Sequence, residues 1–142
     1  MLNWPDQLTV NEYVPGGGIP PHVDTHSAFC ESIASVSLGS GVLMEFCPVD
    51  GDRETEKICV HLPRRSLLVL NGSSRYAFTH QIATRKSDWI GGALRPRAVR
   101  TSLTFRTVQL ARCQCAFVSC CDHPRVLDSV CWWPTQRWFS YA

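Results

Sequence analysis

Apolar and polar residues alternate with period two along most of the chain, the pattern of strands that bury one face. The alternation is clearest in residues 8–14 and 100–106. Shorter candidate strands cover residues 33–38, 42–46, 58–62, 66–70 and 76–80. Gly, Pro and Asn residues, which favour turns, separate these runs. The pattern predicts a mainly β domain whose short strands pack as a sandwich or jelly roll.

Two stretches carry more specific expectations about strand placement. Residues 33–38 and 42–46 are predicted to form a hairpin across the turn at 39–41. The run 66–70 is apolar almost without interruption, which favours a central strand, and Asn71-Gly72 after it is a turn signal.

The remaining stretches lack a strand pattern. Residues 48–56 are polar and acidic, and residues 83–98 have little periodicity, so both are expected to be loops. From residue 123 onward, five aromatic residues crowd together without period 2 or 3.6. We expect an irregular tail there, which either covers a sheet edge or extends from the fold without packing.

Composition narrows the class of protein and its compartment. A chain of 142 residues with 44% hydrophobic residues allows one domain with one core. No apolar run is long enough to span a bilayer, so no membrane association is expected, and the N-terminus does not resemble a secretory signal. We therefore expect a reducing compartment, the cytoplasm or the nucleus. The eight cysteines are then better read as thiols or metal ligands than as disulfides.

Charge is unevenly distributed although the net charge is only +2. Residues 57–112 carry eleven Lys and Arg against one acid, Asp88, whereas residues 1–56 carry nine of the twelve acids. This asymmetry indicates either a solvated basic face or a polyanionic partner such as a nucleic acid.

The residues with the clearest metal chemistry are His22 and Asp24. On an extended strand, side chains two residues apart point to the same face, so an imidazole and a carboxylate can converge there. With His80 from a distant strand they would form a facial triad, the arrangement that leaves open positions on Fe(II). Taken alone, a His-x-Asp pair is more often an ordinary loop pair.

The strand at 100–106 strengthens the metal-site interpretation. Its polar face carries Arg100, Ser102, Thr104 and Arg106. Two arginines facing a barrel interior require a buried anion, since unpaired buried charges cost several kcal/mol each. A dicarboxylate co-substrate would meet that need, and Asn11 and Tyr13 could hydrogen-bond to the same molecule.

Four motifs together resemble the AlkB-type Fe(II)/2-oxoglutarate dioxygenases. The motifs are Asn11-Glu12-Tyr13, His22-Val23-Asp24, the distal His80, and the segment from Arg100 to Arg106. The sequences of residues 21–29 and 62–68 are most similar to those of the branch that modifies the wobble uridine of tRNA. The resemblance covers about residues 5–122.

The resemblance implies a double-stranded β-helix fold and oxidative decarboxylation of 2-oxoglutarate coupled to hydroxylation of a C–H bond. It implies iron on His22, Asp24 and His80, and the distal carboxylate of 2-oxoglutarate on Arg100 and Tyr13. By the same resemblance, Asn11 lies near the other carboxylate. Arg106 is implied near the co-substrate and the substrate side. Where many members of the family have Asn, this chain has Ser102, which leaves the substrate preference open.

A second metal site is suggested by the thiols Cys113, Cys115, Cys120 and Cys121. Three thiolates and one imidazole make a tetrahedral zinc site, and free thiols are the alternative. In the wobble-uridine branch, which this segment also resembles, one His and three Cys hold zinc. That resemblance implies His26, Cys113, Cys115 and Cys121 as ligands of a structural Zn(II). Cys120 is the alternative third thiolate, and His123 is a weaker competitor for the imidazole position.

The resemblance divides the chain into a dioxygenase domain at residues 5–122 and a tail at residues 123–142 that does not resemble the family. Two functions from different classes are considered for such a chain. The first is hydroxylation of a modified nucleobase, the wobble uridine side chain of tRNA, with nucleic-acid demethylation as the repair-type variant. The second is a catalytically inactive, metal-binding remnant that acts as an interaction module. The second follows from the expectation that N-terminal structure of AlkB-type enzymes is missing, which would leave an apolar face exposed. The oligomeric state is left open.

Overall fold

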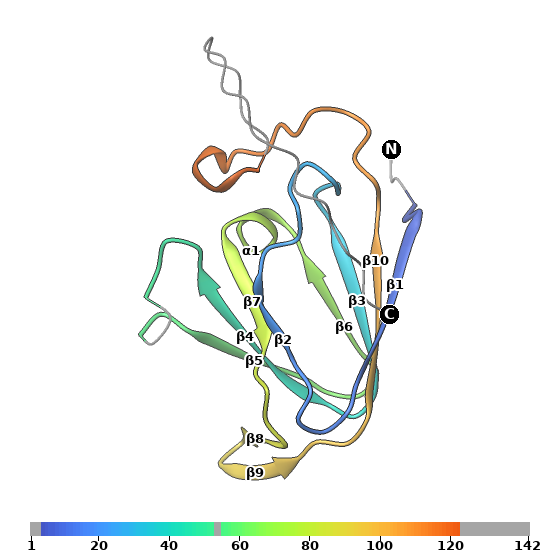
Figure 1. Cartoon of the computed structure of the whole chain (residues 1–142), viewed down its shortest axis with the longest axis vertical. Coiled ribbons are helices and arrows are strands. Elements are labelled where there is room, and N and C mark those ends of the chain that lie inside the picture. The colour runs from blue at the N-terminus through green and yellow to red at the C-terminus, as the bar shows by residue number, and fades with distance from the viewer. Residues whose placement is uncertain (1–3, 53–54, 123–142) are drawn as a thin grey trace.

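The computed structural model describes residues 4–52 and 55–122. Within these residues, two four-stranded antiparallel sheets face each other, and a separate two-stranded hairpin lies at one end (Figure 1). In chain order the elements are β1 Gln7–Tyr13, β2 Ile19–His22, β3 Ile33–Gly39, β4 Val42–Pro48, β5 Ile58–Leu62, β6 Ser66–Leu70, α1 Gly72–Tyr76, β7 Phe78–Ile82, β8 Ser87–Ile90, β9 Ala93–Pro96, β10 Arg100–Arg106 and the 3-10 turn Val118–Cys120.

The strand order is that of a jelly roll, because neighbours in each sheet are distant in the chain. One sheet has the order β1-β10-β3-β6 and the other β2-β7-β4-β5. The first and last long strands therefore pair, with Gln7 opposite Arg106 and Tyr13 opposite Arg100. The prediction of a mainly β double-stranded β-helix is confirmed. The tail at 123–142 lies outside the described residues.

The core lies between the two sheets, where the inward side chains of the alternating strands meet. Its fully buried members are Ile33, Val42, Met44, Phe46, Leu62, Leu70 and Ile82. The predicted hairpin joins β3 to β4 in sequence, but the two strands belong to different sheets, so they do not pair. Gly39 ends β3 at φ +74°, and a Cβ there would clash with the Val99 carbonyl oxygen.

Residues 83–98 were expected to be a loop, and this expectation is wrong. They form the β8–β9 hairpin, which turns at Gly91 and Gly92, both with positive φ. The buried side chain of this hairpin is Asp88, which accepts hydrogen bonds from Arg97 at 2.7 Å and from Arg85 at 2.8 Å. An ion pair, rather than an apolar face, anchors the hairpin.

The strands expected at 66–70 and 76–80 are both present, but the position of the first and the start of the second differ from the expectation. Strand β6 is at a sheet edge rather than in the centre, and Leu67 is 62% exposed. The turn signal at Asn71 is a helix start: Asn71 is the N-cap of the short helix α1. The helix occupies Tyr76, so the following strand begins at Phe78.

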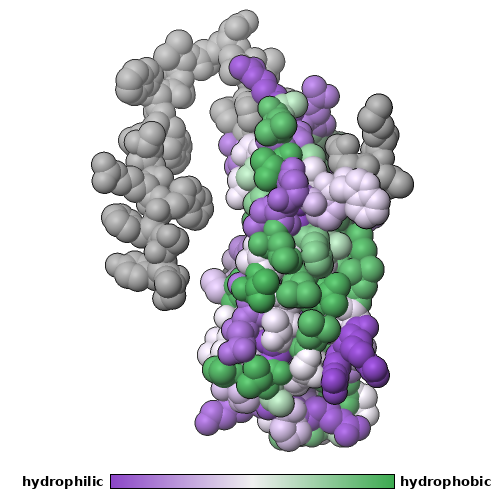
Figure 2. Space-filling view, turned by 90° about the vertical axis from the view of Figure 1, so that its right-hand side faces the viewer, coloured by the Kyte–Doolittle hydropathy of each residue, from purple (hydrophilic) through white to green (hydrophobic). Residues whose placement is uncertain are grey.

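The outer face of the β1-β10-β3-β6 sheet is apolar. The exposed side chains of Leu8, Val10, Leu67 and Val69 alternate with inward residues on the two edge strands. The strand register places the partly exposed Leu103 and Phe105 of β10 between these edges. Figure 2 shows hydrophobic side chains gathered on the side of β1 and β10. In the part of the chain that the structure describes, no helix is long and apolar enough to cross a membrane.

Candidate metal centre and co-substrate pocket

His22, Asp24 and His80 come together between the two sheets at the end of β2. His22 is the last residue of β2 and lies directly opposite His80 on the neighbouring strand β7. Asp24 lies two residues beyond the end of β2, so the expectation that it shares a regular strand face with His22 is wrong. The metal-binding atoms of the three side chains nevertheless lie within 4.8 Å of one another.

The two imidazoles present their Nε2 atoms to the same space. Nδ1 of His22 lies 2.9 Å from the Pro20 carbonyl oxygen, which favours the tautomer with its proton on Nδ1 and a lone pair on Nε2. Nε2 of His80 lies 3.7 Å from Oδ2 of Asp24. The rings of His22 and His80 approach with their centroids 4.3 Å apart.

Asp24 is held through one oxygen, which leaves the other for a metal. Oδ1 accepts hydrogen bonds from Nε and Nη2 of Arg106, at 3.0 and 2.8 Å. Arg106 is itself fixed by Gln7 and Thr9 of β1, which accept from its Nη1. Since Oδ1 is occupied, Oδ2 is the oxygen that faces the two imidazoles.

The local electrostatics keep His80 neutral, which is the form that binds metals. Burial, with the neighbouring His22 acting in the same direction, lowers the pKa of His80 to about 4. The nearby Asp24 carboxylate only partly opposes these effects. At neutral pH the imidazole therefore carries an available lone pair.

Arg100 provides an anion site deeper in the same pocket. Its side chain is 2% exposed, and Nη2 donates a hydrogen bond to Oγ of Ser37 at 2.9 Å. Its buried Nε has no hydrogen-bond acceptor within residues 4–52 and 55–122. In the same ranges no carboxylate forms an ion pair with the guanidinium. The Tyr13 ring lies against the guanidinium, 5.3 Å from ring centroid to Cζ. A buried guanidinium with unused donors fits a carboxylate ligand.

The pocket that joins these groups contains all the residues expected from the β10 face. Ser102, Thr104 and both arginines of β10 line it, and Asn11 faces it from β1 opposite Ser102. The residues expected at the iron and the co-substrate are thus brought together. The residues present fit a divalent metal and a dicarboxylate: three neutral or anionic ligand atoms converge beside a buried cation that lacks an acid.

Sequence reasoning missed two buried residues that support this site. Ser37 supports Arg100, and the alternation of Ser35 and Ser37 with apolar residues on β3 was an available signal for a polar inner face. Arg75 donates to the Asp24 carbonyl oxygen from helix α1. Nothing in the sequence near residue 75 indicated that its side chain would be buried.

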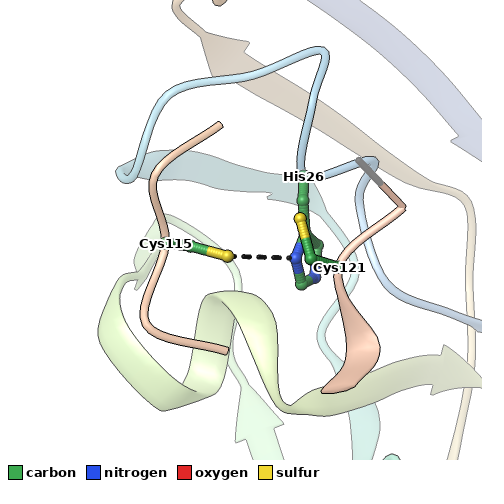
Figure 3. Close-up of side chains that lie close together, drawn as sticks. All are labelled: His26, Cys115 and Cys121. Atoms are coloured by element: carbon green, nitrogen blue, oxygen red, sulfur yellow. Dashed lines mark hydrogen bonds between the residues drawn. The ribbon is translucent and has the colours of Figure 1, made fainter. Parts of the chain in front are cut away.

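A second group of ligand atoms lies at the same end of the molecule. The binding atoms of His26, Cys115 and Cys121 lie within 4.8 Å of one another. The sulfur of Cys115 is 3.6 Å from Nδ1 of His26, and Cys121 lies beside the same ring (Figure 3). Nε2 of His26 lies 3.1 Å from the Tyr76 carbonyl oxygen, which leaves Nδ1 as the ligand atom. Burial and the nearby Arg75 lower the pKa of His26, so this imidazole is also neutral.

Cys113 is the fourth expected member, and it contacts the same group. Burial raises its pKa, but hydrogen bonds involving Cys115 and Cys121 outweigh burial, so the pKa of Cys113 is lowered overall. Cys120 instead directs its thiol to the Tyr76 and Phe117 carbonyl oxygens, at 3.4 and 3.7 Å. The geometry therefore favours Cys121 over Cys120. His123 lies outside the described residues.

Comparison with known proteins gives relatives over most of the chain. This chain is 47% identical over 137 residues to mouse tRNA (carboxymethyluridine(34)-5-O)-methyltransferase ALKBH8. That alignment covers 85% of this chain and 20% of the relative. It is 39% identical to the Arabidopsis thaliana alkylated DNA repair protein ALKBH8 homolog, over 82% of this chain and 38% of the relative. The chain thus spans between a fifth and two fifths of the length of these two relatives.

Comparison with solved structures agrees with the fold. The structure of OsALKBH1 matches with a TM-score of 0.53 and 27% identity, over 72% of this chain and 50% of that one. Residues 3–106 match the 2OG-Fe(II) oxygenase superfamily. With its jelly roll and the ligand set described above, this chain belongs to the 2OG-Fe(II) oxygenase superfamily.

Proposed function

We propose that His22, Asp24 and His80 hold Fe(II), and that Arg100 and Tyr13 bind the distal carboxylate of 2-oxoglutarate. The observation that carries this proposal is the juxtaposition of three ligand atoms within 4.8 Å and a buried guanidinium without an acid partner. When bound, the iron supplies activation of O2, with oxidation of 2-oxoglutarate to succinate and CO2 and transfer of one oxygen atom to a C–H bond.

The protein residues orient the reactants and exclude water. Arg106 fixes the carboxylate of Asp24, so that Oδ2 faces the imidazoles. Arg100 fixes one end of the co-substrate, and Asn11, which lines the same pocket, hydrogen-bonds to the other carboxylate. Ser102, opposite Asn11 on the paired strand, is a shorter donor than the Asn that many members of the family have there.

We further propose that the substrate is a modified nucleobase, the wobble uridine side chain of tRNA. The names of the mouse and Xenopus tropicalis relatives refer to carboxymethyluridine at tRNA position 34. Within residues 57–112 every exposed charged side chain is basic, because the one acid there, Asp88, is buried, and this basic segment supports a polyanionic substrate. The exposed members are Lys57, Arg64, Arg65, Lys86, Arg95 and Arg112.

For the second ligand group we propose a structural zinc ion on His26, Cys113, Cys115 and Cys121. Thiolate and imidazole ligands suit Zn(II), and four protein ligands close its coordination sphere. The ion would fasten residues 113–121 to the loop that carries His26. This proposal is tested by metal analysis, in which Cys113→Ala should lower the zinc stoichiometry; unchanged zinc would remove the proposal.

Formation of succinate from 2-oxoglutarate with Fe(II) and O2 tests the proposed chemistry without a nucleic acid, because uncoupled turnover needs only the co-substrate. The wild type should form succinate, and His22→Ala should not. Equal background in both proteins would favour the inactive, metal-binding remnant instead.

The substrate is tested separately with two RNAs. A tRNA with a methoxycarbonylmethyl group at C5 of uridine 34 should gain the mass of one oxygen atom, whereas an N-methylated oligonucleotide should remain unchanged. Loss of the N-methyl group with no change in the tRNA would identify a demethylase.

A further inference from the structure

One short loop contributes a side chain to each of the two ligand groups. Asp24 belongs to the proposed iron site, and His26, two residues later, belongs to the thiolate group. Two residues span at most about 7 Å of chain. A displacement of residues 24–26 therefore moves a ligand of both groups.

The guanidinium of Arg75 holds this loop in place. Its side chain is 1% exposed, and its donors are directed at backbone carbonyl oxygens of the loop. Nη1 donates to Asp24 at 2.5 Å, and Nη2 donates to Thr25 at 2.9 Å and to Phe29 at 3.3 Å. Three hydrogen bonds from one planar group fix both the position and the direction of the segment.

The neighbouring residue of α1 holds the other ligand. The carbonyl oxygen of Tyr76 lies 3.1 Å from Nε2 of His26, and the two rings are in edge contact with centroids 4.8 Å apart. The Arg75 guanidinium lies over the ring of Tyr76, 4.7 Å from its centroid. Consecutive residues of one helix thus contact Asp24 on one side and His26 on the other.

The charge of Arg75 also relates it to both groups. No carboxylate forms an ion pair with Arg75 within the described ranges. A buried cation that forms no ion pair is costly, even when its donors are hydrogen-bonded. Three thiolates around one zinc ion leave a net negative charge, which would compensate this guanidinium. A filled thiolate site therefore favours the position of Arg75 that holds Asp24.

We propose that Arg75 is a positioning residue that couples the two sites, so that zinc on the thiolate group raises the affinity of His22, Asp24 and His80 for a divalent ion. This inference rests on the proposed iron and zinc sites. Coupling of this kind is reciprocal, so a divalent ion in the iron site should also tighten zinc binding.

The test measures the affinity for Mn2+, which prefers oxygen and nitrogen ligands and substitutes for Fe(II) without oxidation. In zinc-loaded protein, Arg75→Met should weaken Mn2+ binding by about 10–100-fold, the usual effect of removing a group that supports a ligand. The matched control is Arg97→Met, which removes another buried guanidinium, the one that pairs with Asp88. It should lower stability but leave the Mn2+ affinity unchanged.

Coupling is tested by a double-mutant cycle with Cys115→Ser. In the wild-type background this change should weaken Mn2+ binding, and in the Arg75→Met background it should have little further effect. If Arg75→Met does not fold, Arg75→Lys is used in its place, because lysine keeps the charge but lacks the planar guanidinium. The Mn2+ affinity of Arg75→Lys should also fall.

Three results would overturn the inference. Wild-type Mn2+ affinity in Arg75→Met would exclude the positioning role, and equal Mn2+ affinity with and without zinc would exclude the coupling. In both cases the proposed iron site would stand. Absence of Mn2+ binding by the wild type would overturn the iron site and the coupling with it.

Discussion

Replacement of Arg100 by Met should separate co-substrate binding from fold stability. In the free protein the guanidinium is buried, donates one hydrogen bond to Ser37 and has no acid partner in the described ranges. A buried charge of this kind contributes little to stability, and apolar replacements of buried charges are often neutral or stabilising. Loss of one hydrogen bond costs about 1 kcal/mol, so Arg100→Met should lower the free energy of unfolding by no more than about that amount.

The effect on 2-oxoglutarate binding should be much larger. A carboxylate that binds two N–H groups of the Arg100 guanidinium accepts two charge-assisted hydrogen bonds, each contributing about 1.5–3 kcal/mol. Loss of both therefore costs at least about 3 kcal/mol, a fall in affinity of at least about 100-fold.

The assay compares denaturant unfolding of the two proteins with and without 2-oxoglutarate in the presence of Mn2+. The wild type should be stabilised by the co-substrate, and Arg100→Met should show almost no stabilisation at the same concentration. Equal stabilisation of both proteins would refute the assignment of Arg100. A large loss of stability in the ligand-free variant would show that the guanidinium has a structural role instead.

Three further predictions concern the residues around the site and the hairpin. Arg106→Met should weaken Mn2+ binding by about 10–100-fold, because the Oδ1 atom of Asp24 loses both of its donors; unchanged affinity in a metal titration would contradict this. Asp88→Asn should lower the free energy of unfolding by about 3–5 kcal/mol, since it leaves the buried Arg97 unpaired, and a change below about 1 kcal/mol in urea unfolding would argue against the ion-pair anchor. In metal-free protein, the free energy of unfolding should fall by up to about 3 kcal/mol as the pH decreases from 6.5 to 4. The reason is that the pKa of His80 is lowered to about 4, so in this range His80 is protonated in the unfolded state but neutral in the folded state. His80→Gln should reduce that slope in thermal unfolding, and an unchanged slope would assign it to other groups.

The long strands could be predicted because polar and apolar residues alternate regularly along them, although the polar face is the buried one. Strands β1 and β10 have one polar inner face and one apolar outer face, and this alternation is visible in the sequence. The same pattern placed Arg100 and Arg106 on one face, and the structure brings both to the pocket. Here the side chains that face the site are polar because they bind ligands or one another.

The hairpin at 87–96 could not be predicted from hydrophobicity because its two short strands show no regular alternation of polar and apolar residues. Its fully buried side chain is the charged Asp88, whereas Trp89 and Leu94 are 66% and 63% exposed. Its partners, Arg85 and Arg97, satisfy the buried carboxylate. A period-two search for buried apolar residues therefore finds no strand in this segment.

Arg75 and the edge position of β6 also depend on tertiary packing. The partners of Arg75 are backbone carbonyl oxygens of residues 24, 25 and 29, which carry no sequence signal. The apolar run at Ser66–Leu70 faces the core on one side only, and its other side forms part of the apolar outer face seen in Figure 2. Continuous hydrophobicity therefore reflected one buried and one exposed apolar face.

The most direct test of the central claim is anaerobic titration of the protein with Fe(II) and 2-oxoglutarate, followed by visible absorption. A keto acid that chelates Fe(II) at two open positions gives a charge-transfer band. We expect this band to saturate at one equivalent of iron in the wild type and to disappear in both His22→Ala and His80→Ala. A band that persists in both variants, or its absence from the folded wild type, would contradict an iron site built from these two histidines and Asp24.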